Sequence, residues 1–423
     1  MAHITRRRFL QATGSAVAVG ALGFPAIVGA AGKKVVVVGG GAGGATAAKY
    51  IRMADPSIEV TLIEANAEHF TCFFSNEVLS GHRGMDSIKV SYDGLKGHGI
   101  NVVIDTVTEI DAAGRKVKTA GGSTFAYDRC IVAPGIDFKD NIEGYDEAAM
   151  RAMPHAWKAG EQTVLLRKQL EAMPDGGVVA IVAPPNPFRC PPGPYERACQ
   201  IAMYLRARKP KSKLMIFDAK DKFSKQGLFM QAFERHHAGI VEWVAAGKGG
   251  LVTRVDPSSN TIYAGNTAHK VDVANVIPAQ KAGKIAVKAG LTDDKGWCPI
   301  DGRTFESAIH KNIHVVGDAS AASPLPKSAY AANSEAKVAA AAVVDLLNGR
   351  QPGEPSLVNT CYSIIGPNDA ISVAKVYHLD GGKLSGVEGS GGLTPKDSSP
   401  EMRAREVSYA NSWFANIKDD CWG

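Results

Sequence analysis

The sequence lacks the features that would suggest a fibrous, repetitive or nucleic-acid-binding protein. It has no heptad pattern, no low-complexity tract and no solenoid-type repeat. No cysteine or histidine cluster has metal-ligand spacing, and without a Cys-x-x-Cys-His motif any haem must belong to a separate chain. The net charge of +6 includes Arg6, Arg7 and Arg8, so it leaves no basic face of the kind that binds nucleic acid.

Acidic residues are absent from residues 1–30, which have the pattern of a targeting segment. Three arginines precede a weakly apolar stretch over 12–28, and Ala30 and Ala31 offer small residues for cleavage. The pattern predicts export by the twin-arginine route to the periplasm, an oxidising compartment where disulfides persist. A membrane anchor is the alternative. Glycines and a proline interrupt the short apolar stretch, so we expect no stable membrane insertion.

What is present is the composition of a large α/β protein. With 423 residues, 45 glycines and 45% hydrophobic residues, the chain suggests two or three domains. Residues 34–39 contain four consecutive valines, as expected of a strand that is buried on both faces. A helix predicted over 43–53 and a strand over 58–64 complete a βαβ unit.

A second unit of the same outline comes later in the chain. Its strands are predicted over 177–183 and 213–218, with a helix over 195–208 between them. Two such units in one chain suggest that one is nested in the other. A strand over 312–317 then leads into a long alanine-rich helix over 328–347.

The expected fold class is α/β, with two nested Rossmann-like dinucleotide-binding domains and a smaller C-terminal α+β domain. The predicted bounds are 31–150 and 265–350 for the first domain, 151–264 for the second and 351–423 for the third, after a signal over 1–30. In the third domain, alternating residues predict strands around 362–371 and 374–378. The tail over 397–423 has neither a clear apolar stripe nor a basic face.

The first unit carries a dinucleotide fingerprint. Gly39, Gly41 and Gly44 occupy the three defining positions of G-x-G-x-x-G, between the predicted strand and helix. These glycines allow a tight turn and close approach of a pyrophosphate to the positive end of the helix. Glu64, twenty residues further on, ends the second strand, where a carboxylate can accept from ribose hydroxyls. An acid in this place fits FAD or NAD and excludes a 2′-phosphate.

Two further segments decide between FAD and NAD. Residues 312–318 and 128–135 resemble the late strand-Gly-Asp motif and the middle strand of FAD-dependent pyridine nucleotide–disulfide oxidoreductases, and the resemblance covers residues 33–350. It implies that Asp318 binds the flavin ribityl chain and that the first domain binds FAD. The cofactor site would also include Ala133 and Gly135 after the middle strand, and Lys327 and Ser328 at the start of the long helix.

The second unit departs from that family, which normally binds NAD(P)H there. Its turn, residues 183–194, is rich in proline where the family has glycines. Proline has no amide hydrogen to offer a phosphate, and its ring fills space that a pyrophosphate needs. We therefore expect no productive binding of NAD(P)H. Sulfide:quinone oxidoreductases and flavocytochrome c sulfide dehydrogenases are members that lack this use.

The chain has seven cysteines, an odd number, so they cannot all pair as disulfides in an oxidising compartment. The chain resembles flavocytochrome c flavoproteins, in which a cysteine in a segment such as 69–76 forms a thioether to FAD. This resemblance implies covalent FAD on Cys72, and a buried free thiol is the alternative. Cys130 lies in an apolar strand and is predicted to be a buried small hydrophobe.

Cys190 and Cys361 resemble the two cysteines of the redox disulfide in sulfide-oxidising relatives. Hydrosulfide can attack one sulfur of a disulfide and release the other as thiolate. An ordinary structural bridge remains an alternative, as do pairings among three other cysteines, namely Cys199, Cys298 and Cys421. Glu196, at the start of the second helix, is a candidate acid/base, although an acid favoured by the helix dipole explains it too.

The resemblance implies a sulfide:cytochrome c oxidoreductase. Hydrosulfide would reduce the disulfide, and electrons would pass through FAD to a c-type cytochrome subunit that carries the haem. Trp413 and Trp422 are candidates to cover the flavin and the disulfide. The alternatives are a sulfide:quinone oxidoreductase, which would need membrane-docking helices, and an electron-transfer flavoprotein without a substrate of its own.

Overall fold

Two parallel sheets organise residues 32–423, the part of the chain that this computed structural model describes. The predicted export signal lies outside the described residues. The first sheet has the strand order β19-β9-β1-β2-β5. Its strands are β1 (Lys34–Val38), β2 (Glu59–Glu64), β5 (Asn101–Ile104), β9 (Arg129–Val132) and β19 (Ile313–Val315). All the pairings are parallel, and Val35 to Val38 are buried, as the run of valines predicted.

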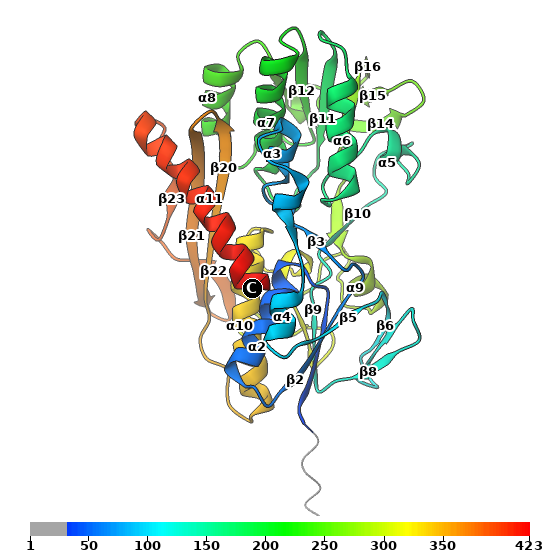
Figure 1. Ribbon diagram of the computed structural model, residues 1–423, viewed down its shortest axis with the longest axis vertical. Coiled ribbons are helices and arrows are strands. Elements are labelled where there is room, and N and C mark those ends of the chain that lie inside the picture. The colour runs from blue at the N-terminus through cyan, green and yellow to red at the C-terminus, as the bar shows by residue number, and fades with distance from the viewer. Residues whose placement is uncertain (1–31) are drawn as a thin grey trace, which may run out of the picture. The chain divides into compact units, whose positions relative to one another are not determined.

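The alanine-rich helices pack directly on each other. Helix α2 (Ala42–Ala54) follows β1, and α10 (Ala329–Leu347) follows β19, so both predicted helices are confirmed. They lie side by side over most of their length (Figure 1). Buried alanines such as Ala47, Ala336 and Ala340 allow this close approach because their side chains are short.

The second sheet has the order β13-β12-β11-β17, again with parallel pairings. Its strands are β11 (Val178–Ala183), β12 (Lys213–Asp218), β13 (Val241–Val244) and β17 (Val273–Val276). Helix α7 (Gly193–Arg208) joins β11 to β12, which completes the second predicted unit. This sheet comes from the chain between β9 and β19 of the first sheet, and the two units are therefore nested as predicted. Because β17 pairs with β11, the second sheet extends beyond residue 264.

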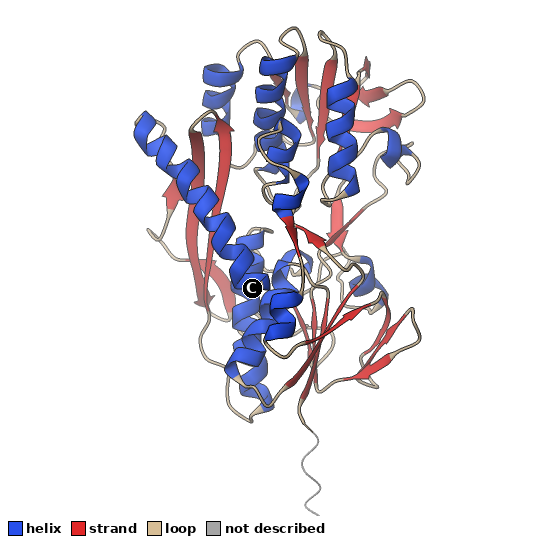
Figure 2. Ribbon diagram, in the orientation of Figure 1, coloured by secondary structure: helices blue, strands red, loops and turns tan. Residues whose placement is uncertain are grey.

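The C-terminal region is built on a long antiparallel hairpin. Strand β20 (Ser356–Gly366) pairs with β21 (Asp369–Asp380), and helix α11 (Pro400–Trp422) packs against both (Figure 2). Most of the β structure expected around 362–371 and all of that around 374–378 is confirmed, but the first segment is divided between β20 and β21 because the hairpin turn falls inside it. Asn368, with φ of +52°, makes the turn.

Helix α11 also corrects the reading of the tail, since its buried positions follow helical spacing. They are Arg403, Glu406, Ala410, Phe414, Ile417, Cys421 and Trp422. The sequence did not reveal this buried stripe because its first two residues, Arg403 and Glu406, are charged. Within residues 32–423, no helix has the length and apolarity needed to span a membrane.

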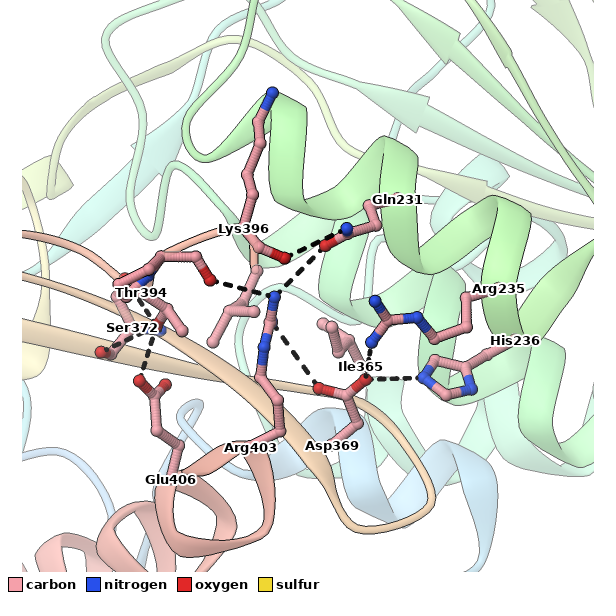
Figure 3. A network of polar contacts seen from close by, with 12 residues as sticks. Gln231, Arg235, His236, Ile365, Asp369, Ser372, Thr394, Lys396, Arg403 and Glu406 are labelled. Carbon is pink, nitrogen blue, oxygen red and sulfur yellow. Dashed lines mark hydrogen bonds and ion pairs between the residues drawn. The ribbon is translucent and has the colours of Figure 1, made fainter. Parts of the chain in front are cut away.

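A partly buried polar network contacts the start of α11 (Figure 3). The carboxylate of Asp369, at the beginning of β21, lies 2.7 Å from His236 Nε2 and 3.4 Å from Arg235 Nη1, both on α8 (Gln226–His237). Arg403 of α11 approaches the same carboxylate at 3.7 Å and donates to Gln231 Oε1 at 3.2 Å. Helices α8 and α11 are thus connected through one acidic residue of the hairpin.

The remaining elements are short. The helices are α3 (Ser75–Ser80), α4 (Asp93–Gly97), α5 (Ala149–Ala152), α6 (Glu161–Ala172), α9 (Lys284–Lys288) and the 3₁₀ turns Met85–Ile88, Ala246–Lys248 and Gly317–Ala319. The strands are β3 (His69–Phe70), β4 (Lys89–Val90), β6 (Val107–Asp111), β7 (Lys116–Thr119), β8 (Thr124–Ala126), β10 (Ile136–Phe138), β14 (Val252–Asp256), β15 (Thr261–Ala264), β16 (Thr267–Lys270), β18 (Gln280–Ala282), β22 (Lys383–Gly386) and β23 (Gly392–Leu393).

Candidate active site

A cavity of about 740 Å³ opens where β1, β9 and β19 end. Residues from the turn before α7 and from β20 also line it, so it gathers segments that are far apart in the sequence. The predicted site residues in its lining are Gly39, Gly41, Glu64, Cys72, Ala133, Gly135, Cys190, Glu196, Asp318, Ser328 and Cys361. Gly44 and Lys327 are not in the lining but contact residues that are, since Gly44 packs against Gly39 and Lys327 donates to the Asp318 carbonyl.

The glycine turn after β1 is tightly packed on one side and open on the other. A Cβ at Gly39, whose φ is +98°, would come 2.4 Å from the Ala133 carbonyl oxygen, and one at Gly44 would come 1.8 Å from the Gly39 oxygen. At Gly41 a Cβ would meet nothing nearer than 3.8 Å. Helix α2 begins directly after this turn without an acidic first turn or a side-chain cap, so its first amides can receive an anion.

Glu64 ends β2 beside this turn, as the fingerprint predicts. Its Oε2 accepts from the Gly40 amide at 2.7 Å, and its Oε1 accepts from the Asn66 amide at 3.1 Å. The carboxylate is therefore fixed at the rim of the cavity by two backbone donors.

The segment after β19 presents an unsatisfied acid to the cavity. Asp318 Oδ1 is buried without a hydrogen-bond partner among residues 32–423, while Oδ2 lies 3.6 Å from Arg189 Nη1. Burial raises the pKa of Asp318. Lys327 Nζ donates to the Asp318 and Ser320 carbonyls at 2.8 and 2.7 Å, which holds this segment in position. Ser328 caps α10 by accepting from the Ala331 amide at 3.0 Å.

These residues fit FAD. The unpartnered Asp318 oxygen can accept from a ribityl hydroxyl, and the open face at Gly41 leaves room for a pyrophosphate. The start of α10, which has no acid in its first turn, lines the same cavity. No group of histidine, cysteine, aspartate or glutamate side chains within the described residues could hold a metal ion.

The structure places Cys72 in the wall of this cavity. Its side chain is half-buried, and its carbonyl accepts from the Ser75 hydroxyl at 2.6 Å and the Ser75 amide at 3.2 Å. Phe74, in the left-handed region with φ of 65°, completes the turn into α3. The thiol is free, and the residue lines the cavity in which FAD fits.

Cys190 and Cys361, which lie 171 positions apart in the chain, come together in the cavity. The two thiols are near enough to shift each other's pKa, and neither forms a disulfide in this structure. The Cys361 thiol donates to the Tyr362 carbonyl at 3.8 Å. Cys190 has a left-handed backbone with φ of +56°, held by its amide donating to the Lys327 carbonyl at 2.8 Å. A Cβ at Gly193 would come 2.9 Å from the Cys190 sulfur, so only glycine leaves that sulfur room.

The two sulfurs are not electrostatically equivalent. The neighbouring Cys190 thiol lowers the pKa of the Cys361 thiol, and the charge of Lys225 adds to this against the effect of burial. The Cys361 thiol, together with burial, raises the pKa of Cys190. When the two cysteines are reduced, the thiolate therefore forms on Cys361 in preference to Cys190.

Glu196, in the first turn of α7, lies beside the sulfur pair. Its Oε1 accepts from the Ile364 amide at 2.9 Å, and its Oε2 accepts from Asn76 Nδ2 at 3.2 Å. Burial raises the pKa of this carboxyl to about 7. A group with that pKa can take up or give a proton near neutral pH.

Two arginines of the site were missed by the sequence analysis. Arg189 lies between Asp318 and the cysteines, and Arg197 is buried without a carboxylate partner within the described residues. Arg197 donates to Asn76 Oδ1 at 3.0 Å and to Asn275 Oδ1 at 2.9 Å, and burial lowers its pKa to about 9. No sequence signal separates these arginines from exposed ones, because the residues that bury them are distant in the chain.

The other cysteines are single buried thiols. Cys130, Cys199 and Cys298 belong to one core cluster and Cys421 to another, and none forms a disulfide in this structure. Cys130 is 0% exposed, which confirms the prediction of a buried small hydrophobe.

Of the two tryptophans proposed as covers, Trp413 lines the cavity and stacks on Tyr330 with ring centroids 6.1 Å apart. Trp422 does not line it. Its indole stacks on His69 and donates to the Gly40 carbonyl at 3.0 Å, so it packs against the glycine turn.

The acid at the end of the second strand of the second βαβ unit binds side chains of its own domain. Asp218, at the end of β12, is 0% exposed. Its carboxylate accepts from Tyr195 Oη at 2.5 Å, Lys220 Nζ at 2.6 Å and Trp243 Nε1 at 3.0 Å. Phe223 stacks on Tyr195 with centroids 3.6 Å apart. The acid that would bind a ribose in a Rossmann fold is thus occupied by neighbouring side chains.

Comparison with known families gives three matches. Residues 163–278 match the model for the central part of the sulfide dehydrogenase (flavocytochrome c) flavoprotein chain, and residues 353–422 match that for the flavin-binding part of flavocytochrome c sulphide dehydrogenase. Residues 33–167 match the pyridine nucleotide-disulphide oxidoreductase model. The sulfide dehydrogenase (flavocytochrome c) flavoprotein chain of Chlorobaculum thiosulfatiphilum is 63% identical over 46 residues, which are 11% of this chain and 96% of that sequence.

Solved structures share the fold at low sequence identity. The sulfide:quinone oxidoreductase of Aquifex aeolicus superimposes with a TM-score of 0.71 and 19% identity, covering 92% of each chain. An NAD-dependent persulfide reductase from A. fulgidus gives a TM-score of 0.62 and 17% identity, covering 90% of this chain and 76% of that one. These values confirm the predicted α/β architecture and carry no information on substrate.

Proposed function

Because the chain belongs to the family of flavocytochrome c sulfide dehydrogenase flavoproteins, we propose that it oxidises hydrosulfide and delivers the electrons to a c-type cytochrome chain. One observation carries this proposal: the thiols of Cys190 and Cys361 meet in the cavity that also holds the glycine turn and Asp318. The cysteine pair that would receive electrons from sulfide therefore lines the same cavity as the residues that fit FAD.

The sulfur pair performs the first step in its oxidised form. Hydrosulfide attacks one sulfur of the Cys190–Cys361 disulfide, a new S–S bond forms, and the old one breaks with its electron pair on the other sulfur. The products are a cysteine persulfide and a cysteine thiolate. The cavity keeps both next to the place where FAD fits.

The chain would hold FAD through the glycine turn, Glu64, Asp318 and the start of α10, with a thioether to Cys72. When bound, FAD supplies an acceptor that takes two electrons from sulfur and passes them on singly. A covalent link would keep the cofactor on a protein exported to the periplasm, where we propose that the enzyme works.

Glu196 is proposed to take the proton that leaves the sulfur site. Since burial raises its pKa to about 7, the carboxyl is mostly protonated below that pH and mostly ionised above it. We expect kcat at saturating sulfide to rise as the pH increases from 6 to 8. Glu196→Gln should lower kcat by about 10²-fold and flatten this profile.

Steady-state rates from pH 5.5 to 9 would check this expectation. The protonation of free sulfide changes kcat/KM. At saturating sulfide, kcat therefore reports the ionisation of the enzyme group alone. Glu242→Gln, an exposed carboxyl on β13, serves as the control and should keep the wild-type profile. A Glu196→Gln enzyme with an unchanged kcat profile would refute the proton-transfer role.

NAD(P)H is not expected to serve as the donor. Prolines replace the phosphate-binding glycines after β11, and Asp218 is buried under three donors of the same domain. Anaerobic NADH should leave the flavin absorbance unchanged, whereas hydrosulfide should bleach it in the same sample. Bleaching by NADH at a rate comparable to that with sulfide would contradict this proposal.

The acceptor can be identified in the same preparation. A detergent-free sample supplied with sulfide should reduce cytochrome c and should not reduce a soluble quinone analogue. Preferential reduction of the quinone would support a sulfide:quinone oxidoreductase instead.

A further inference from the structure

Lys225 is a buried lysine beside the sulfur pair with no carboxylate ion pair within residues 32–423. It is 5% exposed and stands at the start of α8 with a left-handed φ of +59°. Its Nζ donates to the Cys361 carbonyl at 3.1 Å and to Ser363 Oγ at 2.8 Å, both on β20. A third acceptor, the Ile371 carbonyl at 3.5 Å, lies on β21.

These three acceptors are neutral, so they satisfy the hydrogen bonds of the ammonium and leave its charge unbalanced. A buried cation is costly unless a negative charge lies nearby. The groups whose charge interacts with Lys225 are Glu196 of α7 and the Cys361 thiol. Glu196 is neutral whenever it holds a proton, and then the thiolate of Cys361 is the remaining negative group among residues 32–423 that interacts with the lysine.

The cations around the pair differ between its two sulfurs, whereas the charge of Glu196 interacts with both. Cys361 interacts with Lys225. The guanidinium groups of Arg189 and Arg197 interact with Cys190 and Cys72. Lys225 is thus the fixed cation on the side of Cys361.

We propose that Lys225 is a positioning residue that holds the negative charge of the opened pair on Cys361 and thereby directs hydrosulfide to Cys190. The inference rests on the proposed function and specifies its first step. The sulfur of hydrosulfide bonds to Cys190 Sγ, and its hydrogen stays on the new terminal sulfur. The Cys190–Cys361 bond breaks, and its electron pair goes to Cys361 Sγ, next to the ammonium. The better stabilised thiolate is the better leaving group in such an exchange.

Alkylation of the reduced protein tests this role without turnover. The protein is reduced, treated with iodoacetamide at pH 5 to 10, and digested so that mass spectrometry follows the Cys190 and Cys361 peptides separately. In the wild type Cys361 should react at the lower pH. Lys225→Met should raise the pH midpoint for Cys361 by about one unit or more, since it removes an opposite charge.

Lys225→Arg should restore the wild-type midpoint because it keeps the charge. Lys222→Met, an exposed lysine three residues earlier, should not alter it. After one equivalent of hydrosulfide, the extra sulfur should be found on the Cys190 peptide. A Cys361 midpoint that does not move in folded Lys225→Met protein, or the extra sulfur on Cys361, would overturn the inference while leaving the proposed function intact. Failure of the oxidised pair to react with hydrosulfide in the wild type would instead defeat the proposed function itself.

Discussion

Replacing Cys361 with serine is expected to reduce sulfide-dependent reduction of cytochrome c by about 10³-fold or more, because an oxygen cannot take part in the disulfide exchange. The substitution is nearly isosteric, and β20 is anchored by its pairing with β21 over almost its whole length. The fold and the flavin content should therefore stay unchanged. Stopped-flow absorbance of the flavin and steady-state cytochrome reduction would both measure the loss.

The control for this experiment is Cys421→Ser. Cys421 accepts from the Thr46 hydroxyl at 3.2 Å and lies in a different core cluster, so a hydroxyl can take its place without touching the sulfur pair. Its activity should remain close to that of the wild type. If the Cys361→Ser enzyme retained its sulfide-dependent rate, the pair would be structural, and an electron-transfer flavoprotein without a sulfur substrate would become the better account.

Replacing Cys72 with alanine is expected to remove all covalently held flavin. Wild-type protein precipitated with acid should stay yellow, and its intact mass should exceed that of the polypeptide by one FAD. In Cys72→Ala the yellow colour should pass into the supernatant and the added mass should vanish. The expectation follows from the position of Cys72 in the cavity wall and from its role in the family that the chain resembles.

Cys190→Ser provides the matched control, since it alters a thiol of the same cavity and should keep the added mass. An adduct that persists in Cys72→Ala would place the link on another residue. A wild-type protein whose mass shows no adduct would mean that FAD is bound without a covalent link, which would leave the sulfur chemistry unaffected.

Local patterns were sufficient to predict the two βαβ units. Four valines before a glycine turn define a buried parallel strand, and Gly44 is needed because its Cβ would meet the Gly39 oxygen within the same turn. The same holds for the long helix, which is alanine-rich because it packs closely on α2. In these cases the residues that form an element also carry its pattern, so the element can be predicted even where its packing partner is distant.

The position of the hairpin turn and the buried face of the last helix were predicted wrongly because they depend on contacts between residues that are far apart in the sequence. The turn at Asn368 divides a segment whose alternation continues on both sides, and only the pairing of β20 with β21 reveals it. Arg403 and Glu406 occupy buried positions of α11 because each has a polar partner there. Arg403 forms an ion pair with Asp369, and Glu406 accepts a hydrogen bond from Thr394. Charged residues at the start of a stripe obscure its apolar face.

The sulfur pair shows the same limit within the site. Cys190 and Cys361 were paired by resemblance, and their spacing gave no reason for it. Nothing in the local sequence marked Lys225 and Arg197 as site residues, since a buried cation cannot be distinguished from a solvated one by its sequence neighbours. Their importance follows from the neutral partners that surround them in the folded chain.

Peptide mapping without reductant, before and after one equivalent of hydrosulfide, tests the central claim most directly. We predict that the oxidised protein yields the Cys190 and Cys361 peptides as one linked species. Sulfide should then separate them, with one extra sulfur on one peptide and a free thiol on the other. Recovery of both cysteines as free thiols before sulfide is added, or a linkage that sulfide leaves intact, would contradict the account.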